Sequence, residues 1–266
     1  ALASTPGYDP NVFTAPVSRL TWTTLISDPR HPLNDRAISS FYAPGSTFKV
    51  LMSIVGLETG TITPETTVFC PGSVVIYNRQ FMCWKKGGHG TVDVHRALVQ
   101  SCNVFYYLLG RKVGIDAISK YAKMFGIGEL SGIDIPGESR GNPPSAEWKQ
   151  RIHKEPWYPG DTISVSIGQG LLATTPVQMA TMISAVANGG TLVQPHLARD
   201  AKMESAKIPV AAETLALIRD ALADVVEEGT ATRAQLGPIH VAGKTGTAQV
   251  FKKSVGVDAD KQPKNE

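Results

Sequence analysis

Segments of helical periodicity separated by proline and glycine limit what this sequence can fold into more than any other feature. Apolar residues recur at the spacing of an α-helix in four segments: 46–59, 94–110, 176–188 and 212–228. Gly60 and Gly229 follow the first and the last of these segments and supply natural stops. Only residues 239–250 alternate in the manner of a longer strand. Many helices with few strands predict a mixed α and β fold built around one sheet.

Proline-rich stretches mark the expected connections. The first forty residues are predicted to be loop with at most short elements, and residues 137–160 to be a long surface connection. Residues 70–90 are expected to be irregular or to form a short hairpin, with strand-forming side chains at 74–77. Ser101-Cys102-Asn103 interrupts the 94–110 segment. Because serine and asparagine side chains compete with the helical backbone for hydrogen bonds, we expect a break there.

The charge and hydropathy of the chain exclude several classes of function. Its 26 lysines and arginines nearly balance its 23 aspartates and glutamates, so the formal net charge is only +3. That balance provides no electrostatic field for nucleic acid or for an anionic membrane surface. The sequence lacks the roughly 18-residue apolar run of a membrane-spanning helix, and its start lacks the pattern of a secretion signal. A hydrophobic fraction of 42% is typical of a folded globular chain.

Ser46-Thr47-Phe48-Lys49 stands at the start of the first helical segment. Residues three apart lie on one face of a helix, which places the Ser46 hydroxyl and the Lys49 ammonium within reach of each other. A serine becomes a nucleophile when a nearby base accepts its proton, and a lysine serves as that base when burial or a second cation lowers its pKa. Alone the motif is weak, since a solvent-facing serine and lysine on an amphipathic helix give the same pattern.

Two further motifs carry hydroxyl, amide and ammonium groups. Ser101 and Asn103 form a Ser-x-Asn motif, which by itself is more often a helix break with local hydrogen bonds. Lys244-Thr245-Gly246-Thr247 lies on the predicted strand, where its lysine and hydroxyls can hold a carboxylate. Gly246 there allows a ligand backbone to approach closely. The competing interpretation is an edge strand protected by a lysine. The order and spacing of the three motifs shift the balance toward a shared site.

Ser-x-x-Lys, then Ser-x-Asn, then Lys-Thr-Gly is the signature of penicillin-binding proteins and serine β-lactamases. Three surrounding stretches sharpen the likeness: Tyr42-Ala43-Pro44-Gly45 before Ser46, Trp157-Tyr158-Pro159-Gly160-Asp161, and Gly168-Gln169-Gly170. From residue 2 to about residue 250, the chain resembles the transpeptidase domain of a class B penicillin-binding protein of the cell-elongation type, the penicillin-binding protein 2 group. The resemblance implies that residues 1–266 are a partial D,D-transpeptidase domain of the α+β fold shared with serine β-lactamases. In that fold helices flank an antiparallel sheet.

The resemblance implies a role for each motif residue, and no cofactor for catalysis. Ser46 would attack the carbonyl of the penultimate D-Ala of a stem pentapeptide, while Lys49 accepts its proton. Ser101, aided by Lys244, would pass a proton to the departing D-Ala. The other motif residues would bind the donor peptide: Asn103 at its amide groups, Thr245 and Thr247 at its terminal carboxylate, and Gly246 along its backbone. Backbone N–H groups of Ser46 and Thr247 would form the oxyanion hole.

The same resemblance implies a function and a setting. An amine on a neighbouring stem peptide would attack the acyl-enzyme and cross-link peptidoglycan during cell elongation and cell-shape maintenance. β-Lactams would acylate Ser46 as mimics of the donor. Members of this family act at the periplasmic face of the bacterial inner membrane, beside a polytopic glycosyltransferase and other elongation-complex proteins. Their membrane anchor is expected to lie outside this chain.

Two rival functions stay open. A β-lactam hydrolase or a D,D-carboxypeptidase would need a base that activates water. The glutamates between the second and third motifs, Glu138, Glu147 and Glu155, stand in no recognisable pattern for that task. A non-enzymatic β-lactam sensor could keep all three motifs. Both remain alternatives to the transpeptidase.

A candidate metal site is formed by three cysteines and one histidine: Cys70, Cys83, His89 and Cys102. Their spacing is not that of a zinc finger, yet three sulfurs and one imidazole are a complete tetrahedral set for structural zinc. Because its neighbours in the Ser-x-Asn motif must face the substrate, Cys102 is expected to point toward the 70–90 insertion, where zinc would brace that motif. Some elongation-type relatives carry acidic or Cys/His residues in this region. The alternatives are a Cys70–Cys83 disulfide with a free Cys102, and three buried thiols beside an unrelated histidine.

Both ends of the chain depart from the family pattern. Residues 2–4 resemble the tail of an early strand whose beginning is missing. Residues 251–266 are polar and charged, where the family continues with two more strands and a closing helix. We therefore expect this sequence to be part of a larger protein whose other segments complete a five-stranded sheet.

Overall fold

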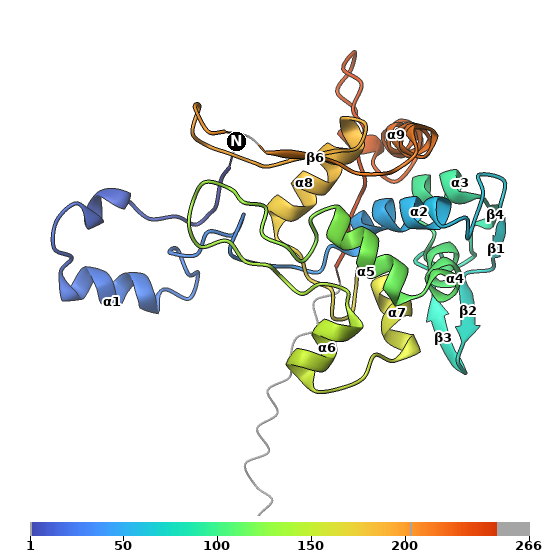
Figure 1. The fold of residues 1–266 in the computed structure, drawn as a ribbon, viewed down its shortest axis with the longest axis horizontal. Helices are drawn as coiled ribbons and strands as arrows, with labels where there is room; N and C mark the ends of the chain where they lie inside the picture. The colour runs from blue at the N-terminus through green and yellow to red at the C-terminus, as the bar shows by residue number, and fades with distance from the viewer. Residues whose placement is uncertain (1, 203, 249–266) are drawn as a thin grey trace, which may run out of the picture.

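The computed structural model describes residues 2–202 and 204–248 (Figure 1). Its helices are α1 (Arg19–Ser27), α2 (Lys49–Glu58), α3 (Val94–Val99), α4 (Asn103–Val113), α5 (Ile115–Met124), α6 (Ala146–His153), α7 (Pro159–Val165), α8 (Pro176–Ala187) and α9 (Ala212–Glu227). Its strands are β1 (Val68–Cys70), β2 (Ser73–Ile76), β3 (Arg79–Met82), β4 (Gly90–Val92), β5 (Thr191–Val193) and β6 (Ser205–Lys207). Short 3₁₀ helices are η1 (Pro10–Phe13), η2 (Gly45–Phe48) and η3 (Thr232–Ala234).

Helix α2 lies at the centre of the core. Every residue from Lys49 to Gly56 is buried, as expected of a helix that is surrounded on all sides. Helices α3, α4, α5 and α9 all contact it (Figure 1). The predicted helix after Gly45 and its end before Gly60 are thereby confirmed, with η2 as its first turn. This packing fixes the helix that begins with the first motif.

The other predicted helices are also present. Helix α9 covers the 212–228 segment, and α8 begins at Pro176 with Thr175 and Gln178 capping it reciprocally through side chain and backbone. The break in the 94–110 segment is confirmed, because α3 ends at Val99 and α4 begins at Asn103. None of the described helices combines the length and apolarity that crossing a bilayer requires.

Within residues 2–202 and 204–248, three separate two-stranded antiparallel sheets are present and no continuous sheet joins them. Strand β1 pairs with β4, β2 with β3, and β5 with β6. The β2–β3 pair is the expected hairpin within residues 70–90, and its turn residues Tyr77 and Asn78 have φ values of 51° and 58°. Positive φ at both turn positions matches the right-handed twist of a two-residue hairpin. The α+β class is thus confirmed, while the sheet is divided.

The expected strand over residues 239–250 is not formed in its described part. Residues 240–248 have no strand assignment, and residues 249 and 250 lie outside the described residues. A strand requires a neighbouring backbone to receive its N–H and C=O groups. None of the described segments provides that ladder beside residues 244–248. Residues 2–4, expected to end an early strand, are irregular as well.

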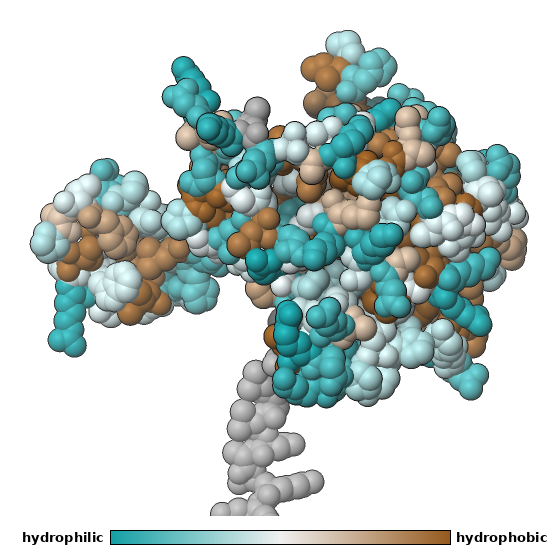
Figure 2. All heavy atoms as spheres, viewed as in Figure 1, coloured by the Kyte–Doolittle hydropathy of each residue, from teal (hydrophilic) through white to brown (hydrophobic). Residues whose placement is uncertain are grey.

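Two segments expected to be connections contain helices. Helix α1 lies within the first forty residues, and α6 lies within 137–160. Both begin at a serine whose side chain accepts a backbone hydrogen bond, Ser18 from Thr21 and Ser145 from Trp148. Figures 1 and 2 show the α1 segment standing apart from the helical body, and none of its residues is buried. Local capping can therefore form a helix where core-facing periodicity gives no signal.

Candidate active site

Ser46 occupies the turn η2 that leads into α2. The preceding Gly45 donates its backbone N–H to the carbonyl of Gly168, which follows α7, with an N···O distance of 2.9 Å. The half-buried Ser46 side chain lines a cleft of about 670 Å³. Residues of the other two motifs line the same cleft: Ser101, Asn103, Thr245 and Thr247. The fold therefore gathers all three motifs, separated by up to about two hundred residues, around one opening.

Lys49 ties the first motif to the second. Its Nζ donates to the Ser101 carbonyl at 2.9 Å, to Ser101 Oγ at 3.2 Å and to Asn103 Oδ1 at 2.6 Å. The side chain is fully buried, and this desolvation, with a smaller contribution from the charge of Lys244, lowers the pKa of Lys49 to about 7. Burial disfavours an ammonium whose hydrogen-bond partners are all uncharged. Lys49 is consequently poised to exist in its neutral, proton-accepting form near neutral pH.

The break between α3 and α4 sets the direction of the second motif. Ser101 lies in the left-handed region with φ of 53°, and Asn103 is the first residue of α4. Their side chains meet Lys49, while the buried Cys102 between them points to the other side, toward Cys70 and His89. This alternation is the one expected from the sequence.

The third motif lies directly against the turn that holds Ser46. A side chain at Gly246 would place a Cβ 2.9 Å from Thr47 Cγ2 and 3.2 Å from the Pro44 carbonyl. A side chain here would therefore press on the chain's own turn, so glycine suits this position even without a ligand. Lys244 Nζ donates to Thr245 Oγ1 at 3.3 Å, and burial lowers the pKa of Lys244 to about 8.

The cleft is also lined by residues that had no role in the sequence analysis, among them Gln169, Thr230 and Trp84. Gln169 Nε2 donates to the Thr247 carbonyl at 3.3 Å, and Thr230 Oγ1 lies 2.7 Å from Thr245 Oγ1. Trp84 Nε1 donates to the Gln100 and Ser101 carbonyls, at 3.1 Å each. Gln169 was visible within the Gly-Gln-Gly stretch that carried the family likeness. Thr230 and Trp84 belong to no recognisable sequence motif. Only the fold shows that they lie in the cleft.

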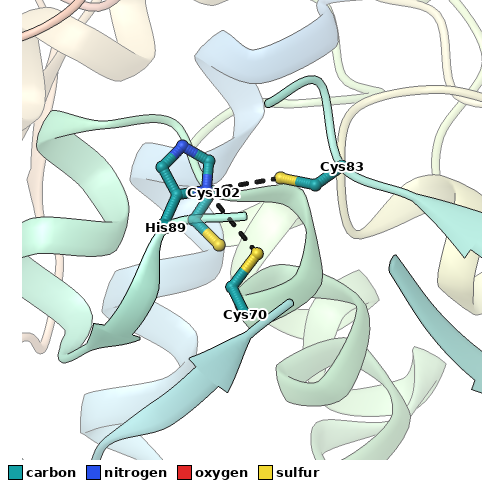
Figure 3. Close-up of side chains that lie close together, drawn as sticks. All are labelled: Cys70, Cys83, His89 and Cys102. Atoms are coloured by element: carbon teal, nitrogen blue, oxygen red, sulfur yellow. Dashed lines mark hydrogen bonds between the residues drawn. The ribbon is translucent and has the colours of Figure 1, made fainter. Parts of the chain in front are cut away.

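The three cysteines and His89 form a cluster behind the second motif (Figure 3). Their potential ligand atoms all lie within 4.8 Å of one another. His89 Nδ1 lies 3.6 Å from Cys70 Sγ and 3.5 Å from Cys83 Sγ. All three cysteines are buried and free, so the structure contains neither the alternative disulfide nor a histidine unrelated to the thiols.

The ionisation of this cluster follows from its hydrogen bonds. The pKa of Cys83 is lowered, because the Cys102 thiol donates to its sulfur and backbone N–H groups around residues 85, 103 and 104 do the same. The pKa of Cys102 is raised by that same bond to Cys83 and by burial. Burial also lowers the pKa of His89, which favours the neutral imidazole. A thiolate beside a neutral imidazole is the form in which both groups bind metals.

Comparison with known proteins agrees with this geometry. Residues 1–263 match the family model for the penicillin-binding protein transpeptidase domain. The chain belongs to this family. The match covers nearly the whole sequence and confirms the class inferred from the three motifs.

Relatives similar to this chain include peptidoglycan D,D-transpeptidases named MrdA. The chain is 36% identical to the peptidoglycan D,D-transpeptidase MrdA of Acinetobacter baumannii, over 94% of this chain and 39% of that protein. It is 37% identical to MrdA of Escherichia coli K12, over 94% of this chain and 42% of that protein. The chain thus spans about two fifths of the length of these relatives.

A solved structure of the same group has the same fold. The penicillin-binding protein PBP2 from Helicobacter pylori matches with a TM-score of 0.88 and 33% sequence identity, covering 93% of this chain and 48% of that one. The same protein has also been solved in complex with MreC. The transpeptidase domain of the penicillin-binding protein 2 group predicted from the sequence is therefore confirmed.

Proposed function

We propose that this transpeptidase domain cross-links peptidoglycan stem peptides through an acyl-enzyme at Ser46. The observation that carries the proposal is Lys49. This fully buried lysine has a pKa of about 7, directly follows the turn that carries Ser46, and is held by both residues of the second motif. A general base is most effective when its pKa lies near the working pH.

The acylation step can be written from the side chains in the cleft. Ser46 Oγ attacks the carbonyl carbon of the penultimate D-Ala as its proton passes to neutral Lys49. The C–N bond to the terminal D-Ala then breaks, and the proton reaches the leaving nitrogen through Ser101, whose Oγ lies 3.2 Å from Lys49 Nζ. An amine of a second stem peptide next attacks the ester carbonyl. This forms the new amide and returns the proton to Ser46.

Binding of the donor falls to the remaining motif residues. Asn103 Oδ1 accepts a hydrogen bond from Lys49, and Asn103 Nδ2 donates a long one of 3.5 Å to the Met82 carbonyl. The second N–H of the Asn103 amide is then available for a carbonyl of the donor. Thr245, Thr247 and Lys244 would bind the terminal carboxylate, with Gly246 keeping that edge close to Ser46. Hydroxyl and ammonium donors suit a carboxylate because bonds to ionised acceptors are the stronger ones.

The cleft favours a transpeptidase over a hydrolase. Its described lining contains no aspartate, glutamate or histidine to activate a deacylating water. Glu138 accepts from the backbone of Ser131 and Gly132, and Glu155 lies 3.7 Å from Lys149, so both are engaged elsewhere. Glu147 lines a different hollow, beside Trp148. An acyl-enzyme without a placed water base would persist until an amine arrives.

We place this activity in cell elongation at the periplasmic face of the inner membrane, with β-lactams as inhibitors. The likeness to MrdA proteins supports the elongation assignment. The complex of the H. pylori relative with MreC supports contact with elongation-complex proteins, among which we include a polytopic glycosyltransferase.

Acylation by a penicillin tests the proposal. Incubation should add the mass of the antibiotic to a peptide containing Ser46, and Ser46→Ala should abolish it. A stem-peptide donor together with an amine acceptor should yield cross-linked product with release of D-Ala. Steady nitrocefin turnover would instead show a hydrolase, and acylation without cross-linking would show a β-lactam sensor.

The cluster behind the cleft is proposed to hold one structural zinc ion through Cys70, Cys83, His89 and Cys102. Structural zinc is almost always bound tetrahedrally by four ligands, and three cysteines with one histidine are a usual ligand set. His89 Nδ1 faces the sulfurs, while its buried Nε2 lacks a hydrogen-bond partner among the described residues (Figure 3). Zinc there would fix the 70–90 segment against Cys102 and so hold Ser101 and Asn103 in place.

Metal analysis tests this site independently of activity. The purified protein should contain about one zinc per chain, and Cys83→Ser should reduce zinc content and thermal stability together. A parent protein without zinc would refute the site, whatever its activity.

A further inference from the structure

Thr230 reaches the cleft from an element that carries none of the three motifs. It follows the end of α9, where the Ala231 backbone N–H donates to the Val225 carbonyl at 2.9 Å. A side chain on Gly229 would place a Cβ 2.7 Å from the Val99 carbonyl and 2.8 Å from Val225 Cα. This tight turn against the end of α3 fixes where Thr230 lies. The position of its backbone is thus set by the helical core.

The hydroxyls of Thr230 and Thr245 form one hydrogen bond, with an O···O distance of 2.7 Å. Lys244 Nζ also lies 3.3 Å from Thr245 Oγ1. An ammonium can only donate, whereas a hydroxyl offers one proton and two acceptor sites. If Thr230 donates as well, both acceptor sites of Thr245 are filled and its own proton must point elsewhere. The open direction is the cleft that both threonines line.

We propose that Thr230 is a positioning residue for the carboxylate of the donor. Its hydroxyl donates to Thr245 Oγ1, so that the Thr245 proton is directed at the bound anion. This rests on the proposed function, in which Thr245 binds that carboxylate. The opposite polarity, Thr245 donating to Thr230, would consume the proton that the ligand needs, and an anion in the cleft disfavours it. Thr230 touches no reacting atom in this scheme and acts only through Thr245.

The test pairs a change in the protein with a change in the ligand. Three variants are made in the full chain: Thr230→Val removes the hydroxyl, Thr230→Ser keeps it, and Thr181→Val removes a buried threonine hydroxyl on α8 that bonds the Val177 carbonyl instead. Each is acylated by benzylpenicillin and by its methyl ester, which keeps the lactam but lacks the carboxylate. The second-order rate constant of acylation at Ser46 is read from the mass shift.

Thr230→Val should lower the rate constant for the acid about tenfold, the lower end of what a hydrogen bond to a charged group contributes. The rate constant for the ester should change less than about twofold, because no anion is there to be recognised. Thr230→Ser should retain the rate of the parent with both ligands, and so should Thr181→Val.

A purely structural role for Thr230 would slow the acid and the ester by the same factor, which overturns the proposal. So would an unchanged rate for the acid in Thr230→Val, or a loss in Thr230→Ser equal to that in Thr230→Val. If the parent chain itself is not acylated at Ser46, the proposed function fails and this inference fails with it. Acylation of the parent with equal losses for the two ligands overturns only the role of Thr230.

Discussion

Lys49 and Lys149 are both almost fully shielded from solvent, and their surroundings give them opposite properties. Lys49 is 0% exposed and Lys149 is 4% exposed. Lys49 Nζ donates to a carbonyl, a hydroxyl and an amide, all uncharged. Lys149 Nζ lies 2.7 Å from Asp161 and 3.7 Å from Glu155, beneath the ring of the half-exposed Tyr158. Burial lowers the pKa of Lys49, whereas the hydrogen bond that Lys149 donates to Asp161 raises the pKa of Lys149.

The difference shows that burial alone does not make a lysine a base. A covered ammonium with a carboxylate partner is a structural ion pair, and it keeps its proton at every physiological pH. One without a carboxylate, and with a second cation near it, gives its proton up near neutrality. The neutral partners of Lys49 are therefore as important to the proposed chemistry as Lys49 itself.

Replacing each lysine by methionine gives the largest contrast. Lys49→Met should lower penicillin acylation of Ser46 by about 10²- to 10⁴-fold, the usual contribution of a general base. Lys149→Met should leave acylation within about twofold of the parent but lower the free energy of unfolding by about 1.5–3 kcal/mol, because it leaves Asp161 without its partner. Acylation is followed by mass spectrometry and unfolding by denaturant titration.

The contrast between the two lysines would be refuted if Lys149→Met also lost acylation while the protein remained folded. Lys149 would then influence the cleft through α7 and Gly168, which lies three residues beyond the end of α7 and accepts a hydrogen bond from Gly45. It breaks equally if Lys49→Met acylates as the parent does, because another group must then accept the proton.

The pH dependence of acylation should report Lys49 directly. With a pKa of about 7, the neutral fraction rises about tenfold per pH unit below pH 7 and levels off above it, and the acylation rate should follow. Lys244→Met removes a nearby positive charge, so the pKa of Lys49 should rise and the rising limb should move to higher pH. Lys149→Met should leave the limb in place. A limb unmoved in Lys244→Met would show that Lys244 does not act on Lys49 through charge.

The difference between the two lysines also marks what could be foreseen from sequence. Ser46 and Lys49 lie three residues apart on a helix with clear apolar periodicity, so their joint position follows from local pattern. Lys149 lies in the proline-rich 137–160 segment, where α6 has no apolar stripe that marks it as helix, and its partner Asp161 belongs to the next helix. Nothing local indicates that the two meet.

Other features depended on contacts between distant parts of the chain. The hairpin within 70–90 and the break at Ser101–Asn103 were predictable, because turn and break residues act locally. The division of the sheet into three pairs was not, since pairing depends on which strands become neighbours. The role of Thr230 was not predictable either, because it depends on the fold bringing the end of α9 next to Thr245.

Stability should change with pH in opposite senses for the two lysines. The pKa of Lys49 is about 7 when folded and has an ordinary value of 10.5, so between these pH values the unfolded chain binds a proton that the folded chain does not. The cost of burying Lys49 is then full below pH 7 and fades as the pH rises, by up to about 1.4 kcal/mol per pH unit. The pKa of Lys149 is raised when folded, so its contribution is full below 10.5 and is lost only as the pH rises through the higher folded value.

Unfolding free energies of the parent and of the two methionine variants between pH 7 and 9.5 measure this. Parent minus Lys49→Met should rise with pH, whereas parent minus Lys149→Met should stay level. Two level differences would mean that Lys49 keeps its proton in the folded protein, and the proposed base would be lost.

The smallest effect is expected from Asp161→Asn, which keeps the shape of the partner of Lys149 but removes its charge. Asparagine can still accept from the Tyr158 backbone N–H, which Asp161 does at 2.9 Å, and Glu155 remains near Lys149. Because both carboxylates are partly exposed, the free energy of unfolding should fall by only about 1 kcal/mol. Acylation of Ser46 should stay within about twofold of the parent, since Asp161 does not line the cleft and charges farther away are screened by salt. A larger loss of acylation than of stability, measured on the same samples, would mean that the start of α7 sets the position of Gly168 and, through Gly45, of Ser46. The ion pair of Lys149 would then also affect catalysis. Lys149 could no longer be contrasted with Lys49 as a lysine with a purely structural role.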